Sequence, residues 1–130
     1  MATFRSFEEI EAWKKARELT NEIYAVTSAG NFAKDFVLRD QIRRASVSIM
    51  SNISDSYERG GNKEFIQFLS VAKGSAGEVR SQLYVANDQG YLTMSEFDRL
   101  YGLAAEVSQI INGLIGYLKQ SELKGIKFRR

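Results

Sequence analysis

The chain has 130 residues and a formal net charge of +2, and it contains no Cys, His or Pro. This length predicts one domain with a core of ordinary size. The lack of Cys and His excludes disulfides, thiol catalysis, Cys–metal sites and imidazole general bases. Without Pro, no predicted helix has to be interrupted.

The N-terminal residues are charged and lack the apolar run of a signal peptide, and no segment approaches the ~20 apolar residues of a membrane span. We therefore expect a soluble, cytoplasmic protein with no membrane partner. Residues 119–130 hold five basic residues and one acidic residue, a net +4 that leaves the rest of the chain at −2. This basic segment indicates either an anionic partner such as nucleic acid or a solvated chain end.

The first helix is predicted to begin near Ser6, because Ser6 and Glu9 match a capping box. An apolar stripe with the three-and-four spacing of a helix follows at Ala12, Ala16, Leu19, Ile23 and Val26. Gly30 is expected to supply the left-handed stop, and residues 31–34 are expected to form a loop.

The second helix is predicted from a cap at Asp35 to Gly60, and its core stripe has a polar row beside it. The stripe is Leu38, Ile42, Ala45, Ile49 and Ile53, and the polar row is Gln41, Arg44, Ser48, Asn52 and Asp55. Burying such a row is costly without partners, so we expect a buried polar network in which Arg44 pairs with Glu78. The alternative is a phosphate, metal or catalytic site at Arg44, Asn52 and Asp55.

The third helix is predicted from a cap at Asn62 to Gly90, and the glycines inside it, Gly74 and Gly77, suggest a close approach by another helix. Thr93 and Glu96 match a second capping box, which begins the fourth helix. Its core stripe is accompanied by a second apolar row at Leu103, Ile110, Ile115 and Tyr117. This row indicates either an oligomer interface or a wide stripe facing the core.

Together these elements predict an all-α fold, an antiparallel up-down-up-down four-helix bundle over residues 1–120 with a basic C-terminal tail over 121–130. A di-iron bundle site needs His, and the sequence shows neither a nucleophile–base pair nor a phosphate loop. We therefore expect a non-enzymatic protein with no metal and no cofactor.

The candidate nucleic-acid contacts are Arg39, Arg43, Arg59, Lys63, Lys73, Lys124, Lys127, Arg129 and Arg130. They would bind phosphates in a salt-dependent way, and the alternative is that they serve solubility alone.

Several motifs, in order along the chain, resemble one bacterial family. Residues 7–13 resemble F-x-x-L-x-x-W with Ile10 in the Leu place, and residues 38–49 match L-x-x-Q-[IL]-R-R-A-x-x-S-[IV]. Residues 64–78 match E-F-x-x-F-L-x-x-A-x-G-S-x-x-E, and Gly90-Tyr91-Leu92 matches the following turn. The sequence thus resembles the four-helix-bundle proteins first found encoded in intervening sequences of 23S rRNA genes. Residues 52–56, NISDS, stand where the family often has N-I-A-E-G, with Asp55 in place of Glu and Ser56 in place of Gly.

The resemblance implies a left-handed antiparallel bundle that assembles as a homopentamer. Related accessory variability determinant proteins of diversity-generating retroelements bind nucleic acid and a reverse transcriptase through a basic surface. We therefore expect a homopentameric scaffold that binds RNA or DNA as a ribonucleoprotein accessory protein. The alternative is a protein–protein assembly module with no nucleic-acid role.

Overall fold

The chain is all-α, and no strand occurs in residues 4–127, the part of the backbone that the computed structural model describes. Side chains are described for residues 4–121. The helices are η1 (Phe7–Glu9, a 3₁₀ turn), α1 (Glu11–Val26), α2 (Gly30–Lys34), α3 (Phe36–Glu58), α4 (Asn62–Asp88) and α5 (Met94–Lys127). The predicted fold class is therefore confirmed as all-α with four long helices.

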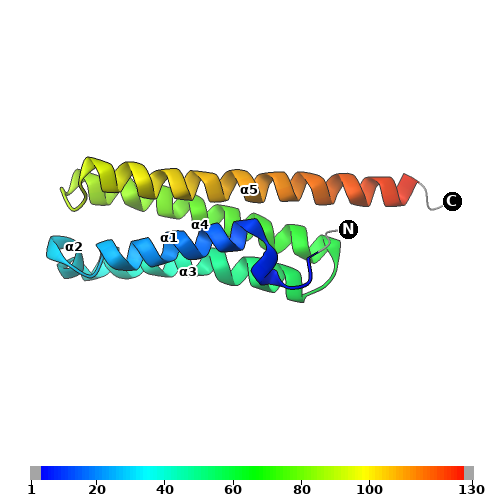
Figure 1. The fold of residues 1–130 in the computed structure, drawn as a ribbon, viewed down its shortest axis with the longest axis horizontal. Helices are drawn as coiled ribbons and strands as arrows, with labels where there is room; N and C mark the ends of the chain where they lie inside the picture. Colours follow the sequence, from blue (N-terminus) through cyan, green and yellow to red (C-terminus); the bar gives the residue numbers. More distant parts are fainter. Residues whose placement is uncertain (1–3, 128–130) are drawn as a thin grey trace.

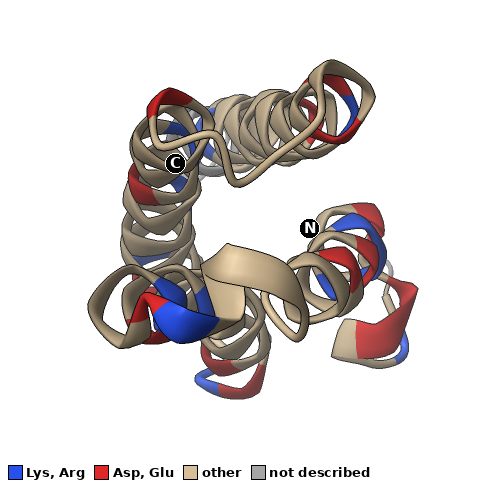
Figure 2. Cartoon of the chain, turned by 90° about the vertical axis from the view of Figure 1, so that its left-hand side faces the viewer, with Lys and Arg blue, Asp and Glu red and all other residues tan. Residues whose placement is uncertain are grey.

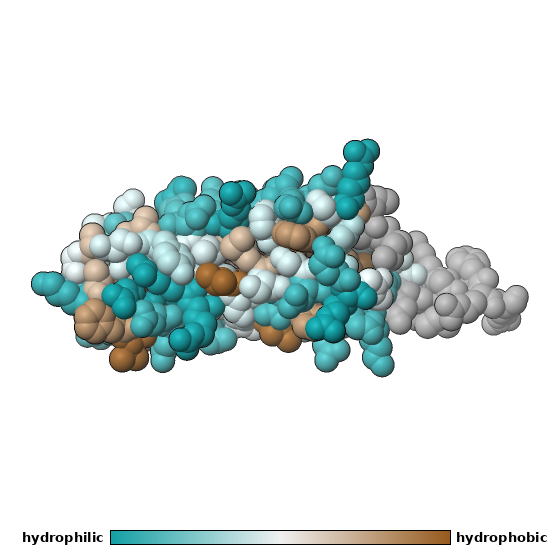
Figure 3. All heavy atoms as spheres, turned by 90° about the horizontal axis from the view of Figure 1, so that it is seen from below, coloured by the Kyte–Doolittle hydropathy of each residue, from teal (hydrophilic) through white to brown (hydrophobic). Residues whose placement is uncertain are grey.

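The four long helices each pack against two others. Helix α3 lies between α1 and α4, and α5 packs against α4 and α1. In Figure 1 the chain reverses direction at each turn, and α5 extends beyond the other helices toward its C-terminal end. Figure 2, seen along the helices, shows Lys and Arg interspersed with Asp and Glu. On the face shown in Figure 3, hydrophobic residues form small, separate patches among hydrophilic ones.

Two of the predicted helix starts are confirmed by their hydrogen bonds. The backbone N–H of Leu38 donates to Asp35 Oδ1 at 3.1 Å, which caps α3. At the start of α5, the N–H of Glu96 donates to Thr93 Oγ1 at 3.0 Å and the N–H of Thr93 donates to Glu96 Oε1 at 2.9 Å. This reciprocal pair is the capping box that the sequence predicted.

Two other predicted starts are wrong. Ser6 makes no side-chain capping bond, and Glu9 Oε1 instead accepts from the N–H of Arg5 at 3.1 Å. Ile10 has an extended backbone (φ −72°, ψ 121°), and this break makes residues 7–9 a separate 3₁₀ turn. Asn62 is the first residue of α4, whose N-cap is Gly61.

Glycines with positive φ mark the turns, although Gly30 does so differently from the prediction. Helix α1 ends at Val26, and Gly30 (φ +64°) begins the short helix α2 in place of the predicted loop. Gly90 (φ +77°) ends α4 as predicted. There the N–H of Tyr91 donates to Ala86 O and that of Gly90 donates to Asn87 O, which is a Schellman motif.

The core consists of the predicted stripes, and small residues bring α3 and α4 close together. Ile42, Ile49 and Ile53 of α3 are fully buried, as are Ala72 and Ala76 of α4. Between these two helices the hydroxyls of Ser48 and Ser75 lie 3.0 Å apart. Short side chains at such positions allow neighbouring helix axes to approach at the short end of the usual 8–10 Å range.

The second apolar row of α5 is partly explained within one chain. Leu103 and Ile115 are 9% and 8% exposed, so they belong to a wide stripe that faces the core. Because the core of the chain already buries Leu103 and Ile115, their apolar character does not require an oligomer interface. Ile110 is half-buried against the core and Tyr117 is 51% exposed, and an interface role for these two residues stays a prediction.

The glycines inside α4 are not explained by helix contacts within the chain. A Cβ added at Gly74 would meet no heavy atom within 4 Å, and one added at Gly77 would meet only Nη2 of Arg80, at 3.9 Å. The expected close approach of a second helix of this chain is therefore wrong.

In the described part of the chain, none of the helices combines the length and the apolar character needed to cross a lipid bilayer.

Candidate functional site

The polar row on α3 lies at the surface, so the expected buried network is wrong. Gln41, Arg44 and Asp55 are exposed, as is Glu78 on α4, while Ser48 and Asn52 are half-buried. Arg44 and Glu78, both described in full, form no ion pair. The row follows the edge of the α3–α4 contact, where long polar side chains reach water, so that burial costs them little.

Only the middle of the row forms a hydrogen-bonded cluster between the helices. Asn52 Nδ2 donates to Ser48 O at 2.8 Å and to Ser48 Oγ at 3.1 Å, and Ser48 Oγ also contacts Ser75 Oγ. The cluster satisfies its own polar groups, which gives it a structural role. In the described residues, no group of three or more carboxylates has the arrangement of a metal site. The alternative reading of the row as a metal centre therefore has no support from the geometry.

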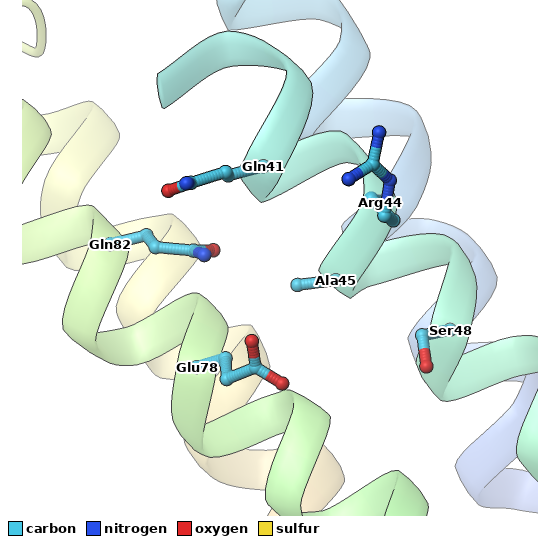
Figure 4. Close-up of a pocket in the computed structure, with 6 residues that line it drawn as sticks. All are labelled: Gln41, Arg44, Ala45, Ser48, Glu78 and Gln82. Carbon is cyan, nitrogen blue, oxygen red and sulfur yellow. The ribbon is translucent and has the colours of Figure 1, made fainter. Parts of the chain in front are cut away.

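The first half of the row, from Gln41 to Ser48, lines a groove between α3 and α4. We call it the α3/α4 groove; it has a volume of about 370 Å³ and is lined by Gln41, Arg44, Ala45, Ser48, Glu78 and Gln82. Figure 4 shows Gln41 and Gln82 reaching into it from opposite helices and the carboxylate of Glu78 pointing into it. Most of these residues belong to the motifs at 38–49 and 64–78, so the structure brings the two motifs together.

The side chains of Arg39 and Arg43 are both held by contacts with nearby residues of the same chain. Arg39 Nε lies 2.9 Å from Oδ1 of Asp40, and its Nη1 donates to a backbone carbonyl at 3.1 Å. The guanidinium of Arg43 lies 4.5 Å from the ring centre of Tyr24, and its Nε donates to Thr27 Oγ1 at 2.8 Å. Both arginines are half-buried, and these contacts restrict how far they can reach toward a phosphate.

The other candidate cations are spread along the molecule. Arg59 stacks on Phe68 and lies with Lys63 at the α3–α4 turn, about 24 Å along α3 from Arg43 at the helical rise of 1.5 Å per residue. Helix α5 continues to Lys127, so the first part of the predicted tail has a helical backbone. The side chains of Lys124 and Lys127, and the whole of Arg129 and Arg130, lie outside the described residues.

A different set of cations gathers where α4 and α5 meet. Lys73 Nζ donates to Asn112 Oδ1 at 3.0 Å, and Arg80 Nη1 donates to Ser108 Oγ at 2.6 Å. One turn beyond Arg80, the ring of Tyr84 contacts that of Tyr101 at 5.4 Å between centres. The exposed Lys119 lies two helical turns after Asn112 on the same side of α5. We call this surface the α4/α5 seam, which consists of Lys73, Arg80, Tyr84, Tyr101, Ser108, Asn112 and Lys119.

Among the described side chains, no carboxylate forms an ion pair with Lys73, Arg80 or Lys119 of the α4/α5 seam, while the side chain of Glu122, three residues after Lys119, lies outside the described residues. Between residues 65 and 87 the only acid is Glu78, which lines the groove on the opposite side of α4. Between residues 99 and 121 the only acid is Glu106, which lies 3.7 Å from Lys15 of α1. Lys73 and Arg80 have neutral hydrogen-bond partners, so each keeps its full charge available to an anion.

The aromatic end of the seam consists of two neutral phenols, with Asp88 one turn beyond Tyr84. The hydrogen bond with Tyr101, followed by the charge of that phenol and by desolvation, raises the pKa of Tyr84 above its ordinary value of 10.0. Tyr84 is 51% exposed and therefore offers a ring to a partner. Sequence reasoning singled out Lys73 but missed Arg80, Lys119 and Tyr84. The available signal was the spacing of seven and four residues from Lys73 to Arg80 to Tyr84, which puts all three on one helix face.

Residues 8–113 match the family model described as 23S rRNA-intervening sequence protein. A solved structure from Bacteroides thetaiotaomicron VPI-5482, described as a protein with unknown function from the S23 ribosomal protein family, is similar to this chain with a TM-score of 0.75 and 24% identity. The match covers 81% of this chain and 95% of that chain, and at this identity it shows the fold alone. No curated protein matches the sequence. Because the family model covers most of the chain, as the motif resemblance predicted, the chain belongs to the 23S rRNA-intervening sequence protein family.

Proposed function

We propose that this protein is a non-enzymatic, homopentameric scaffold that binds nucleic acid along the α4/α5 seam. Each subunit is an antiparallel up-down-up-down four-helix bundle. The observation that carries the nucleic-acid role is the presence of Lys73, Arg80 and Lys119 on one face without an ion pair to any described carboxylate. In an oligomer this face is repeated, and the number of phosphate contacts rises with the number of subunits.

The chemistry of the seam suits a phosphate backbone with unpaired bases beside it. Lysine and arginine bind phosphates through charge and release counterions, which makes binding depend steeply on salt. Successive cations seven residues apart lie about 10.5 Å apart along a helix. Tyr84 and Tyr101 add ring faces on which a base can stack, a contact that tolerates many sequences. We therefore propose single-stranded RNA or DNA as the ligand, bound with weak sequence preference.

The test is binding of a fluorescently labelled 20-nucleotide single-stranded RNA, followed by anisotropy between 50 and 200 mM salt. The triple variant Lys73→Gln, Arg80→Gln and Lys119→Gln should bind more weakly and with a shallower salt dependence, by about one unit of slope for each lost phosphate contact. The control variant Lys14→Gln, Arg17→Gln and Lys34→Gln has the same change in net charge on α1 and α2.

A truncation that ends at Ser121 separates the seam from the basic C-terminal residues. If the truncated protein keeps its affinity while the seam variant loses it, the seam carries the binding. Equal loss in the seam variant and the control variant would mean that net charge alone attracts the RNA. No binding by the intact protein at 50 mM salt would refute the nucleic-acid role.

A second candidate function, a protein–protein assembly module, is favoured by apolar side chains beside the α3/α4 groove. Val37 is 70% exposed and lies one turn before Gln41, while Val85 is 44% exposed and lies one turn after Gln82. Val71, 50% exposed, lies on the same side of α4, two turns before Glu78. These side chains flank the groove and offer apolar area to a second subunit.

A further inference from the structure

The α3/α4 groove contains hydrogen-bond acceptors that the chain leaves unused. Oε1 of Gln82 is buried, and no donor of the described residues reaches it. A buried carbonyl oxygen without a donor is unfavourable, and native structures rarely tolerate it. Gln82 lines the groove, so a rotation of its amide toward the groove would let a bound ligand supply the missing N–H.

A free carboxylate lies next to this oxygen. Glu78 is one turn before Gln82 on α4, and its carboxylate points into the groove in Figure 4. It has no cation within ion-pair distance among the described residues. Arg44 lines the same groove, but its guanidinium points away from Glu78 (Figure 4). The groove therefore contains two acceptors without a donor, the carboxylate of Glu78 and Oε1 of Gln82.

The size and shape of the groove restrict the ligand. Its volume of about 370 Å³ is at the lower end of the range for small-ligand sites, and the short side chains of Ala45 and Ser48 are part of its lining. A guanidinium group is planar and has five N–H donors, which lets it bind a carboxylate with two hydrogen bonds and still donate to another oxygen. An ammonium group concentrates three donors on one atom and matches two separated acceptors less well.

We propose that the α3/α4 groove binds a guanidinium group, which pairs with the carboxylate of Glu78 and donates to Oε1 of Gln82. The guanidinium belongs either to a free guanidino compound or to an arginine side chain of a second copy of this chain. Gln41 lies opposite Gln82 across the groove (Figure 4). This role is separate from nucleic-acid binding, because the groove and the seam lie on opposite sides of α4.

The experiment titrates N-acetylarginine amide into the intact protein and follows the side-chain amide signals of glutamine by NMR. Saturable shifts of the Gln82 and Gln41 signals are expected. The uncharged isostere N-acetylcitrulline amide should bind at least about tenfold more weakly, because the charge-assisted hydrogen bonds are lost. Glu78→Gln should weaken binding by a similar factor, whereas Arg44→Gln should bind at least as tightly because a nearby positive charge is removed.

A control on the same helix, Glu64→Gln, should leave the titration unchanged, and thermal unfolding verifies that each variant is folded. Sedimentation distinguishes the two sources of the guanidinium. If Glu78→Gln lowers the mass of the assembly and N-acetylarginine amide dissociates the wild-type assembly, the guanidinium comes from a second copy. If the mass is unchanged and the free compound binds, the ligand is a small molecule. Equal binding of the arginine and citrulline compounds, or no effect of either compound on shifts or mass, would overturn the proposal.

Discussion

The phenol of Tyr91 donates a hydrogen bond to Oδ2 of Asp35 at 3.0 Å, and this contact joins parts of the chain that are 56 residues apart. The other carboxylate oxygen of Asp35 accepts the N–H of Leu38 and caps α3. The ring of Tyr91 also stacks on Phe32, which is buried in α2. One carboxylate thus fixes the start of α3 and the turn before α5 at the same end of the molecule.

Removing this carboxylate should destabilise the protein. Asp35→Ala loses both the helix cap and the bond to Tyr91, and the cap alone contributes about 1 kcal/mol. Asp35→Asn keeps a good capping side chain and should lose less. Urea denaturation measures the free energy of unfolding for both variants. Equal losses for the alanine and asparagine variants would contradict the capping role.

The same contact predicts a pH dependence. The hydrogen bond to Asp35, followed by desolvation and by the charge of the carboxylate, raises the pKa of Tyr91 above its ordinary value of 10.0. The folded state therefore favours the protonated phenol, and the resulting stability is fully present below pH 10 and is lost as the pH rises through the folded-state pKa. The wild type should be more stable than Tyr91→Phe at pH 8, and the difference should shrink above pH 10. A constant difference from pH 8 to pH 11 would contradict the assignment.

The sequence was sufficient to predict the elements whose signals are local. The stripes at three-and-four spacing predicted the buried faces, and the Thr93–Glu96 and Asp35 caps are where the side-chain types placed them. The first capping box failed because the extended backbone at Ile10 separates the turn at 7–9 from α1. The motif Ser6–Glu9 therefore marked the approximate start of the first helical turn but neither the capping bond nor the point at which α1 begins.

The residues of the candidate site were predicted less well, because their exposure depends on how the helices pack against one another. A helical wheel places Arg44 and Asn52 beside the core stripe, but their exposure depends on how closely α4 approaches. The contact through Ser48 and Ser75 leaves Asn52 half-buried and Arg44 in solvent. The α4/α5 seam requires the register between two helices, which the contact of Lys73 with Asn112 shows and the sequence does not.

The exposure of Arg44 changes the expected effect of its removal. A buried ion pair that loses one member would cost about 3–5 kcal/mol. Arg44 is exposed and has no ion pair with Glu78, so Arg44→Ala should change the free energy of unfolding by less than about 0.5 kcal/mol. The neighbouring Ile42→Ala, at a fully buried position, should cost about 2–5 kcal/mol and serves as the positive control.

A pair of glycine substitutions should have opposite effects on stability. Gly113 lies inside α5, is exposed, and has no heavy atom within 4 Å of an added Cβ. Gly113→Ala should therefore stabilise the subunit by about 0.5–1 kcal/mol. Gly90 has φ +77°, and Gly90→Ala should destabilise it by about 1–2 kcal/mol. Denaturant midpoints for both variants measure the two effects, and a loss of stability in Gly113→Ala would indicate that α5 is packed against another chain there.

The exposed valines beside the α3/α4 groove provide a test of how subunits assemble. If a second subunit packs on this face, Val37→Ser and Val85→Ser together should lower the mass seen by sedimentation at micromolar concentration, because apolar contact area is lost. Val47→Ser changes a 40% exposed valine that lies on another side of α3, beside Tyr24 and Arg43, and it should leave the mass unchanged. All three positions are solvent-exposed, so the subunit fold should persist in every variant. A wild type that sediments as a monomer would refute the scaffold proposal, whereas equal dissociation by Val47→Ser and the double variant would place the interface elsewhere on α3.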